Sequence, residues 1–513
     1  MQSIHSMSAT SIHAHTPWTV PRSNRMGSFI SRSTEDPRPR VAISQWSPLL
    51  LLPTELIQYI AYLLPTDLDR AYLASCCTRL ASMILPAESH IWRWLFRDSY
   101  DDRLLRSAVE YKNDYQVRGL VLSQDVNFRY GQKKEQTFWL ALLNQLIIEA
   151  LICTENHDLL DSEGSKNLIR LEEALAGHEF LNRPTNGYMM ISPDPPSELF
   201  CAIQLHLTFL ALDPSISVRC LRADYDIGMV YPYFKLESQL FAFDYAVLPV
   251  GALHIRNFWV RHLVNPDEAT FYTSYMSLPE HHRPSAPKRL TCCCKPELPT
   301  TWLGYESCIC PPPARTPDLS DRQTCADLSD HMLEVEHMTL YLEKSTDPGN
   351  WPALFDECIY SLGEYSEDRL FFRGIQTYHG SGGERSTPIR GFLEQVYGGG
   401  IRGSWSRIAF VSYERAAHIL AEYAQGPKQD HDQTINQEQG EGGGNGKRQE
   451  LNSFFNEPWP PQDMVEDFES IYGYEGVIVP GGTLAVGHWT DVRLNQPWVG
   501  PFTFTGPFIF WCV

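Results

Sequence analysis

Three prolines divide the stretch from residue 52 to residue 96 into helices that are too short to bury their own apolar side chains. Pro53 suits the first turn of a helix, where its missing N–H costs nothing. Pro65 and Pro86 end the helices that precede them. Between the first two prolines the apolar residues keep helical spacing, at Leu56, Ile57, Ile60, Leu63 and Leu64. We therefore expect a small helical unit whose surplus apolar side chains are covered either by a partner or by the rest of the chain.

The order of residues in this stretch is more specific than its periodicity. Thr66 can cap the second helix, with Asp69 at the third position beyond it. The full pattern is Leu52-Pro53-x-Glu55-Leu56, Ile60, Leu63-x-Pro65-x-Asp67-Leu68, Ala74-Ser75-Cys76-Cys77-x-Arg79-Leu80 and Ile91-Trp92-Arg93. This pattern resembles the F-box across its whole length, at residues 48–98. The Cys-Cys-Thr-Arg-Leu stretch departs from the commoner Val-Ser-Lys/Arg-x-Trp.

The resemblance implies a partner and a set of contact residues. F-boxes bind the Skp adaptor of cullin-based ubiquitin ligases, and they do so with apolar anchors seated in a groove. The positions that match its adaptor contacts are Leu52, Pro53, Leu56, Ile60, Leu63 and Leu68. Cys76, Leu80 and Trp92 are expected to hold the helices of the box together.

The remainder of the chain predicts an α+β protein. Residues 1–45 are polar and aperiodic, which indicates a disordered tail, and residues 99–215 are expected to form a helical linker region. We expect residues 216–367 to form a mixed region with a Pro- and Cys-rich loop at 279–325. Residues 368–513 are expected to form a β-rich receptor domain, interrupted by a disordered insertion at 426–452.

The C-terminal region carries the evidence for a sheet or barrel. Short apolar runs alternate with Gly-rich turns around Gly398 and Gly481, and the chain ends on Phe508-Ile509-Phe510-Trp511. Tyr474 to Gly482, Gly487-His488-Trp489 and Gly506 to Trp511 are similar to motifs of long fungal F-box proteins. The region is also distantly similar to the β-barrel receptor domain of F-box proteins that recognise cyclin D. The two turns are interpreted either as receptor edges or as simple hairpin turns.

Composition excludes some partners. The net charge is −20, the pI is about 5.3, and no run of Lys and Arg forms a basic face, so neither nucleic acid nor an anionic membrane is an expected partner. The 13 cysteines follow no secretory signal, which predicts reduced thiols and a cytoplasmic or nuclear location. Residues 1–34 lack Asp and Glu but contain three Arg, so they form either a targeting segment or a flexible tail.

No constellation for catalysis is found in the sequence. The cysteines at 292, 293, 294, 308 and 310 have spacings that suit zinc poorly, and a reduced cluster on a loop is the alternative. Gly442 to Lys447 lacks the Ser or Thr of a phosphate loop. His488 is expected to be a packed or surface histidine. We therefore predict no catalytic residue, no cofactor and no metal.

These observations predict a substrate-recognition subunit of an SCF-type cullin ubiquitin ligase, without catalysis of its own. It would bind the Skp adaptor, and through it cullin, and would hold an unidentified protein substrate with its C-terminal region. The alternatives are a small-molecule-binding or enzymatic β-barrel protein, and an F-box protein with a role outside degradation. The sequence leaves open the substrate, its degron, any dependence on phosphorylation, and the oligomeric state.

Overall fold

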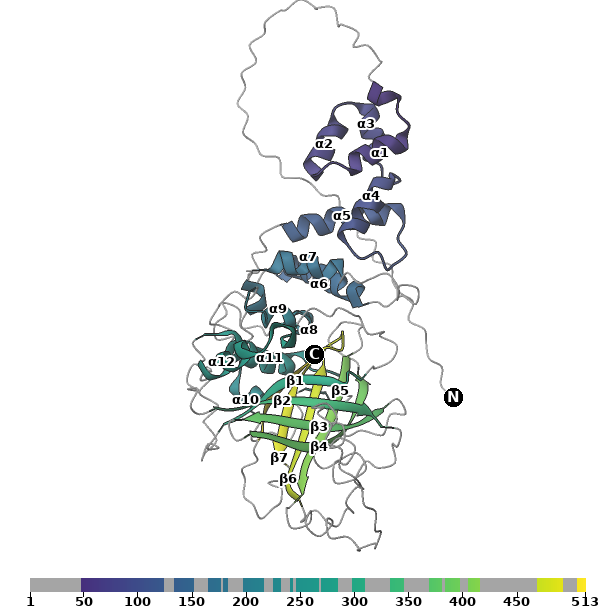
Figure 1. Cartoon of the computed structure of the whole chain (residues 1–513). Coiled ribbons are helices and arrows are strands. Elements are labelled where there is room, and N and C mark those ends of the chain that lie inside the picture. The colour runs from purple at the N-terminus through teal and green to yellow at the C-terminus, as the bar shows by residue number, and fades with distance from the viewer. Residues whose placement is uncertain are drawn as a thin grey trace, which may run out of the picture. The chain divides into compact units, whose positions relative to one another are not determined.

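The chain is α+β, with helices in its N-terminal part and a closed β-barrel in its C-terminal part (Figure 1). The computed structural model describes residues 48–123, 133–151, 165–176, 179–182, 197–215, 225–231, 240–242, 246–266, 269–284, 298–309, 333–345, 369–380, 383–396, 405–415, 468–491 and 505–513. The fold class predicted from the sequence is confirmed. The predicted disordered tail and the insertion at 426–452 lie outside the described residues.

The first helices are those expected from the proline pattern. They are α1 (Thr54–Tyr62), α2 (Asp67–Ser75), α3 (Thr78–Ile84) and α4 (His90–Ser99). Thr66 caps α2, accepting a hydrogen bond from the Asp69 N–H at 3.1 Å. Gln58 joins three of the helices, because it donates to the Met83 carbonyl at 2.9 Å and accepts from the His90 N–H at 3.3 Å. Short helices of this kind depend on such tertiary contacts for their stability.

The residues predicted to hold these helices together differ in their burial. Leu80 and Trp92 are buried, at 3% and 7% exposure, so the prediction that they hold the helices together is confirmed. The same prediction was wrong for Cys76, which is exposed. Cys76 is the C-cap of α2, and its thiol donates to the Tyr72 carbonyl rather than entering the core. Residues 48–53 belong to a separate unit from the chain that begins at Thr54, and Pro48–Leu51 is a single 3₁₀ turn, η1.

A buried cluster of charges joins the next helices. These are α5 (Ala108–Ser123), α6 (Lys133–Leu151) and α7 (Lys166–Leu175). Glu149 of α6 accepts two hydrogen bonds from Arg118 of α5, at 3.0 and 2.7 Å, and one from Arg106 at 2.5 Å. All three side chains are at most 4% exposed. Both guanidinium groups also lie over the ring of Phe96 of α4, so the cluster ties α4, α5 and α6 together.

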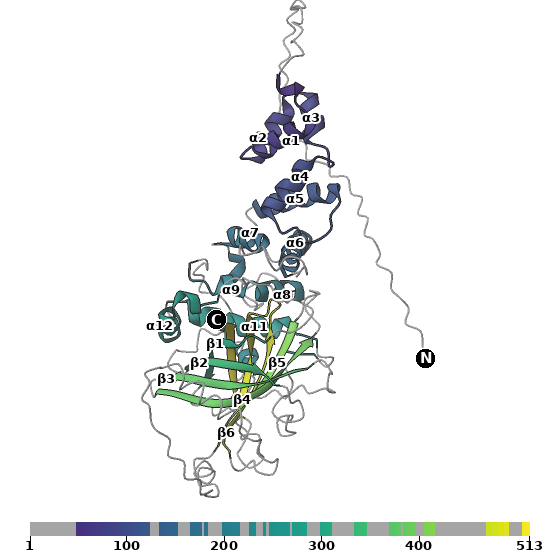
Figure 2. The ribbon, with the colours of Figure 1, turned by 45° about the vertical axis from the view of Figure 1, so that its right-hand side comes forward.

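The last helices pack against one end of the barrel (Figure 2). They are α8 (Glu198–His206), α9 (Thr208–Ala211), α10 (Ile227–Val230), α11 (Pro249–Val264) and α12 (Ala269–Ser277), with 3₁₀ turns η2 (Glu179–Asn182) and η4 (Glu280–His282). The α11 helix is buried along almost its whole length and contacts β7 and β8. The Tyr231 hydroxyl meets Ser307 of β1 at 3.0 Å, and the Trp511 indole donates to the His282 carbonyl at 2.7 Å.

Eight antiparallel strands form the barrel, each bonded to the next in sequence, and β1 closes the ring by pairing with β8. This up-and-down arrangement leaves no unpaired sheet edge. The strands are β1 (Thr301–Ile309), β2 (Leu333–Lys344), β3 (Leu370–Gly380), β4 (Gly383–Val396), β5 (Trp405–Arg415), β6 (Phe468–Ile478), β7 (Leu484–Asp491) and β8 (Thr505–Cys512).

The barrel begins earlier than the sequence predicted. The receptor domain was expected at 368–513, but β1 and β2 precede that range, and β1 lies inside the expected Pro- and Cys-rich loop. The Pro and Cys residues on both sides of Thr301–Ile309 obscured its strand character. Its partners lie far apart in the chain, in β2 and β8, so local patterning could not reveal the pairing.

Aromatic side chains fill the barrel interior. Phe410 stacks on Tyr474, with ring centroids 4.3 Å apart and an angle of 7° between the planes, and further Phe rings surround this pair. Gly476 and Gly487 face each other across β6 and β7. A Cβ at either position would lie 2.6 or 2.5 Å from the ring of Phe508, so only glycine leaves room for that ring. The interior of an eight-stranded barrel is just wide enough to be filled by side chains in this way.

Two buried histidines predict that the fold loses stability in acid. His206 and His254 are each 7% exposed, and burial lowers the pKa to about 3 for His206 and about 4 for His254. Since the unfolded chain has the higher pKa, it binds more protons below about pH 6.5. Stability is therefore highest above that pH and falls as the pH decreases, by up to about 1.4 kcal/mol per pH unit for each histidine.

Urea unfolding at pH 7 and pH 5 checks this expectation. Wild type is expected to lose stability between the two, and a His206→Phe variant should lose about 2 kcal/mol less over the same interval, because it lacks one of the buried histidines that take up a proton on unfolding. An equal loss in both proteins would show that His206 does not contribute.

Candidate functional site

The helix α1 is apolar on both of its sides, and only one side is covered. Ile57 and Ala61 are buried against the other helices of the unit. Leu56 and Tyr59 lie on the other side, and Leu63 follows directly after the helix; at positions i, i+3 and i+7 the three are 49%, 49% and 61% exposed. Uncovered apolar residues at this spacing have the pattern of a helix that docks in a partner's groove.

The helix α2 adds two further exposed apolar residues. Leu68 and Tyr72, four positions apart, are 59% and 61% exposed. We call Leu56, Tyr59, Leu63, Leu68 and Tyr72 together the α1–α2 apolar set. Single exposed apolar residues are common on soluble proteins, but five of them within residues 56–72 make this region a candidate interaction surface.

The underlying helices hold this set in place. The rings of Tyr59 and Tyr62 pack against Trp94 of α4, with centroids 6.1 and 5.6 Å away. The Tyr62 hydroxyl also bonds to the Asp98 carboxylate, and this bond raises the pKa of the phenol. Arg70 of α2 donates to the Leu64 carbonyl at 2.6 Å and so secures the end of α1. A preformed surface of this kind loses little conformational entropy on binding.

The residues predicted to contact an adaptor are all outside the buried core. Leu56, Leu63 and Leu68 are exposed, and Ile60 is partly exposed. Leu52 and Pro53 belong to the preceding unit, in which Leu52 is partly exposed and Pro53 exposed. Three further exposed apolar residues, Tyr59, Tyr72 and Leu51, were not predicted as adaptor contacts. The helical spacing of Tyr59 from Leu56 and of Tyr72 from Leu68 was the signal that could have found the first two.

The barrel interior is the other place where a ligand could be held, and it contains a polar network. Tyr474 donates to Glu306 at 2.7 Å, and Gln376 donates to Tyr378 and Tyr474, each at 2.9 Å. Burial and the nearby Glu306 carboxylate raise the pKa of Tyr474 far above its ordinary value, so this phenol stays protonated. The protonated phenol therefore serves as a hydrogen-bond donor to Glu306.

The predicted cysteine cluster lies mostly outside the described residues, so whether it binds zinc stays a prediction from the sequence. Cys308 lies on β1 and is partly buried, while Cys292, Cys293, Cys294 and Cys310 lie outside the described residues. No group of three or more His, Cys, Asp or Glu side chains among the residues that are described could hold a metal ion. None of the helices in the described ranges is long and apolar enough to cross a membrane.

Of the two Gly-rich turns that were predicted, the structure describes the one at Gly481. Gly398 lies outside the described residues, whereas Gly481 and Gly482 form the β6–β7 turn with φ angles of 104° and 71°. Those angles belong to the left-handed region that favours glycine. His488 of β7 meets the Met229 carbonyl of α10 at 3.0 Å, so it packs against that helix.

Comparison of the chain with protein-family models, with curated proteins and with solved structures gave no match.

Proposed function

We propose that this protein is the substrate-recognition subunit of an SCF-type cullin ubiquitin ligase. Its first helices would bind the Skp adaptor, and through it cullin, while its C-terminal part would hold a target protein. The observation that carries the proposal is the α1–α2 apolar set: Leu56, Leu63 and Leu68, three of the residues that match F-box contact positions, are exposed. Burying one such leucine against a partner is worth about 1.5–3 kcal/mol, enough for a few of them to provide the affinity.

The proposed role needs no catalytic group in this chain. A recognition subunit contributes proximity, because it holds the target where the ligase can reach a lysine. We place this role in the cytoplasm or nucleus, with neither nucleic acid nor membrane as a partner. The aromatic packing of the barrel around Phe410 and Tyr474 favours this proposal over a small-molecule-binding or enzymatic barrel, since such a barrel would need space inside.

The test is binding to the purified Skp adaptor, measured by biolayer interferometry on the full chain. A Leu56→Glu, Leu63→Glu double variant is expected to bind at least about 100-fold more weakly, because two apolar anchors are replaced by charges that must be desolvated. The matched control is Leu120→Glu. Leu120 of α5 is as exposed as Leu63, at 61%, and lies outside the α1–α2 apolar set.

The control should bind within about twofold of wild type. Absence of wild-type binding, or equal binding by the double variant, would mean that these helices do not serve as an F-box. An F-box protein with a role outside degradation would pass this test as well. Reconstituted ubiquitination of a captured target distinguishes that alternative, because only a degradation receptor promotes it.

A further inference from the structure

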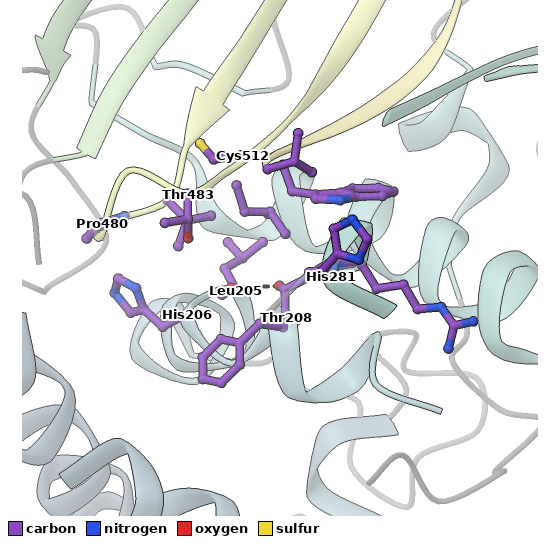
Figure 3. Close-up of a pocket in the computed structure, with 14 residues that line it drawn as sticks. Leu205, His206, Thr208, His281, Pro480, Thr483 and Cys512 are labelled. Carbon is purple, nitrogen blue, oxygen red and sulfur yellow. Dashed lines mark hydrogen bonds between the residues drawn. The ribbon is translucent and has the colours of Figure 1, made fainter. Parts of the chain in front are cut away.

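A pocket of about 250 Å³ lies where the helices meet one end of the barrel (Figure 3). Its walls come from four places: the end of α8 with α9, the segment at η4, the β6–β7 turn, and the end of β8. The apolar wall includes Leu205, Leu484 and Trp511. This volume is below the range of about 300–1,000 Å³ that is typical of drug-sized ligands, and it suits one or two side chains of a peptide.

His206 is a polar group in this pocket that the described chain leaves unsatisfied. It is 7% exposed, it lines the pocket, and its ring packs on Trp405 with centroids 5.3 Å apart. Neither ring nitrogen has a hydrogen-bond partner among the described residues. Burial lowers its pKa to about 3, so the ring is neutral and offers one donor and one acceptor. An unpaired buried group of this kind costs free energy unless a ligand pairs with it.

Arg283 supplies positive charge to the same pocket. One of its terminal nitrogens donates to the Met276 and Leu278 carbonyls, at 2.8 and 3.1 Å, and its Nε is buried without a partner in the described ranges. No Asp or Glu is among the lining residues, and His281 is exposed beside Arg283. An anion that reached Arg283 would have a strong charge-assisted donor.

The β6–β7 turn is a prebuilt wall of the pocket. The backbone of Cys512 donates to the Thr483 carbonyl at 2.9 Å, and its thiol donates to the Gly482 carbonyl at 3.4 Å. The positive φ angles at Gly481 and Gly482 set the shape of the turn. Pro480 and Thr483 of this turn line the pocket, so the surface that meets a ligand is held by the barrel itself.

We propose that this pocket receives a short internal segment of the target protein, in which an Asp or Glu adjoins a large apolar residue. The carboxylate would pair with Arg283, the apolar side chain would lie on Leu205, Leu484 and Trp511, and the peptide backbone would bond to His206. A peptide backbone carries both a donor and an acceptor, which is what a neutral imidazole requires. This inference rests on the proposed function, because it assigns the site that holds the degradation target.

The test uses the full chain as bait for phage that display random heptapeptides between fixed Gly-Ser flanks, so that no free peptide terminus is available. We expect enrichment of peptides in which Asp or Glu adjoins Leu, Ile, Phe or Val. A synthetic enriched peptide should bind about tenfold more tightly than its Asp→Asn or Glu→Gln counterpart, as the loss of a charge-assisted bond implies.

Two variants locate the binding. His206→Phe keeps the ring on Trp405 and removes both nitrogens, and Arg283→Gln removes the charge but keeps N–H donors for the carbonyls. Both should lose peptide selection and keep adaptor binding. His206→Phe is also expected to have an unchanged or higher melting temperature, since it removes an unpaired buried group. A purely structural role for His206 would lower it.

The α1–α2 double variant, Leu56→Glu with Leu63→Glu, separates this inference from the proposed function. It should lose adaptor binding and keep peptide selection. Enriched peptides without an excess of Asp or Glu would overturn the inference. So would a lack of enrichment above an uncoated surface, or selection that survives in both pocket variants. In each of these cases adaptor binding by wild type would still support the proposed function.

Discussion

Replacing Glu149 with alanine is expected to lower the free energy of unfolding of the helical region by about 3–5 kcal/mol. Glu149 is 1% exposed and accepts hydrogen bonds from Arg118 and Arg106, which are themselves 1% and 4% exposed. Burial by itself would raise the pKa of Glu149, but the two arginines hold it below its ordinary value, so the carboxylate is ionised. Its removal takes away the buried carboxylate that both arginines share and leaves them with the partly exposed Asp114, 3.0 Å from Arg106 and 3.7 Å from Arg118.

The comparison is with Glu173→Ala. Glu173 pairs with Arg170 at 3.1 Å, but both side chains are exposed, at 59% and 46%, and an exposed pair contributes about 0–1 kcal/mol. Urea unfolding followed by circular dichroism measures the difference, and hydrogen exchange across α5 and α6 shows where it arises. Equal effects of the two substitutions would mean that the buried cluster does not hold these helices together.

The second large effect is expected inside the barrel. Phe410→Ala should destabilise the barrel by about 3–5 kcal/mol, because it removes a fully buried ring and leaves a cavity. The ring stacks on Tyr474 and lies within 6.5 Å, between centroids, of the rings of Phe372, Phe508 and Phe510. The strands around it are closed into a ring, so they cannot collapse freely onto the space.

Phe138→Ala provides the control, because Phe138 of α6 is 56% exposed and its truncation should change stability by about 0.5 kcal/mol or less. Thermal unfolding followed by tryptophan fluorescence measures both variants. A small effect of Phe410→Ala would indicate that the barrel interior repacks, and would weaken the argument against a ligand-holding interior. Binding of the Skp adaptor should be unchanged in either variant, since neither residue belongs to the α1–α2 apolar set.

Much of the helical N-terminal part could be predicted because its signals are local. Pro65 and Pro86 end their helices without help from distant residues, and Thr66 caps the helix that follows it. The β character of the C-terminal region followed from short apolar runs between Gly-rich turns. The strands that escaped prediction, β1 and β2, pair across long stretches of chain, and β1 is flanked by Pro- and Cys-rich sequence.

The proposed pocket could not be predicted from the sequence. Nothing near His206 or Arg283 in the sequence indicates a ligand, and the two residues are far apart in the chain. They meet in one pocket only because α8 and the η4 segment both pack on the same end of the barrel. The Gly481 turn was flagged as a receptor edge or a simple hairpin turn, but its neighbours across the pocket could not be named.

The sequence by itself determined the succession of helices at residues 52–96 and the mixed α+β class, because capping, proline breaks and apolar periodicity act over a few residues. Only the tertiary structure decided which apolar residues stay uncovered. Ile57 and Leu56 are neighbours of similar size, yet the first is 1% and the second 49% exposed. The difference arises because burial depends on which elements pack against each side of α1, and that packing joins residues distant in the chain.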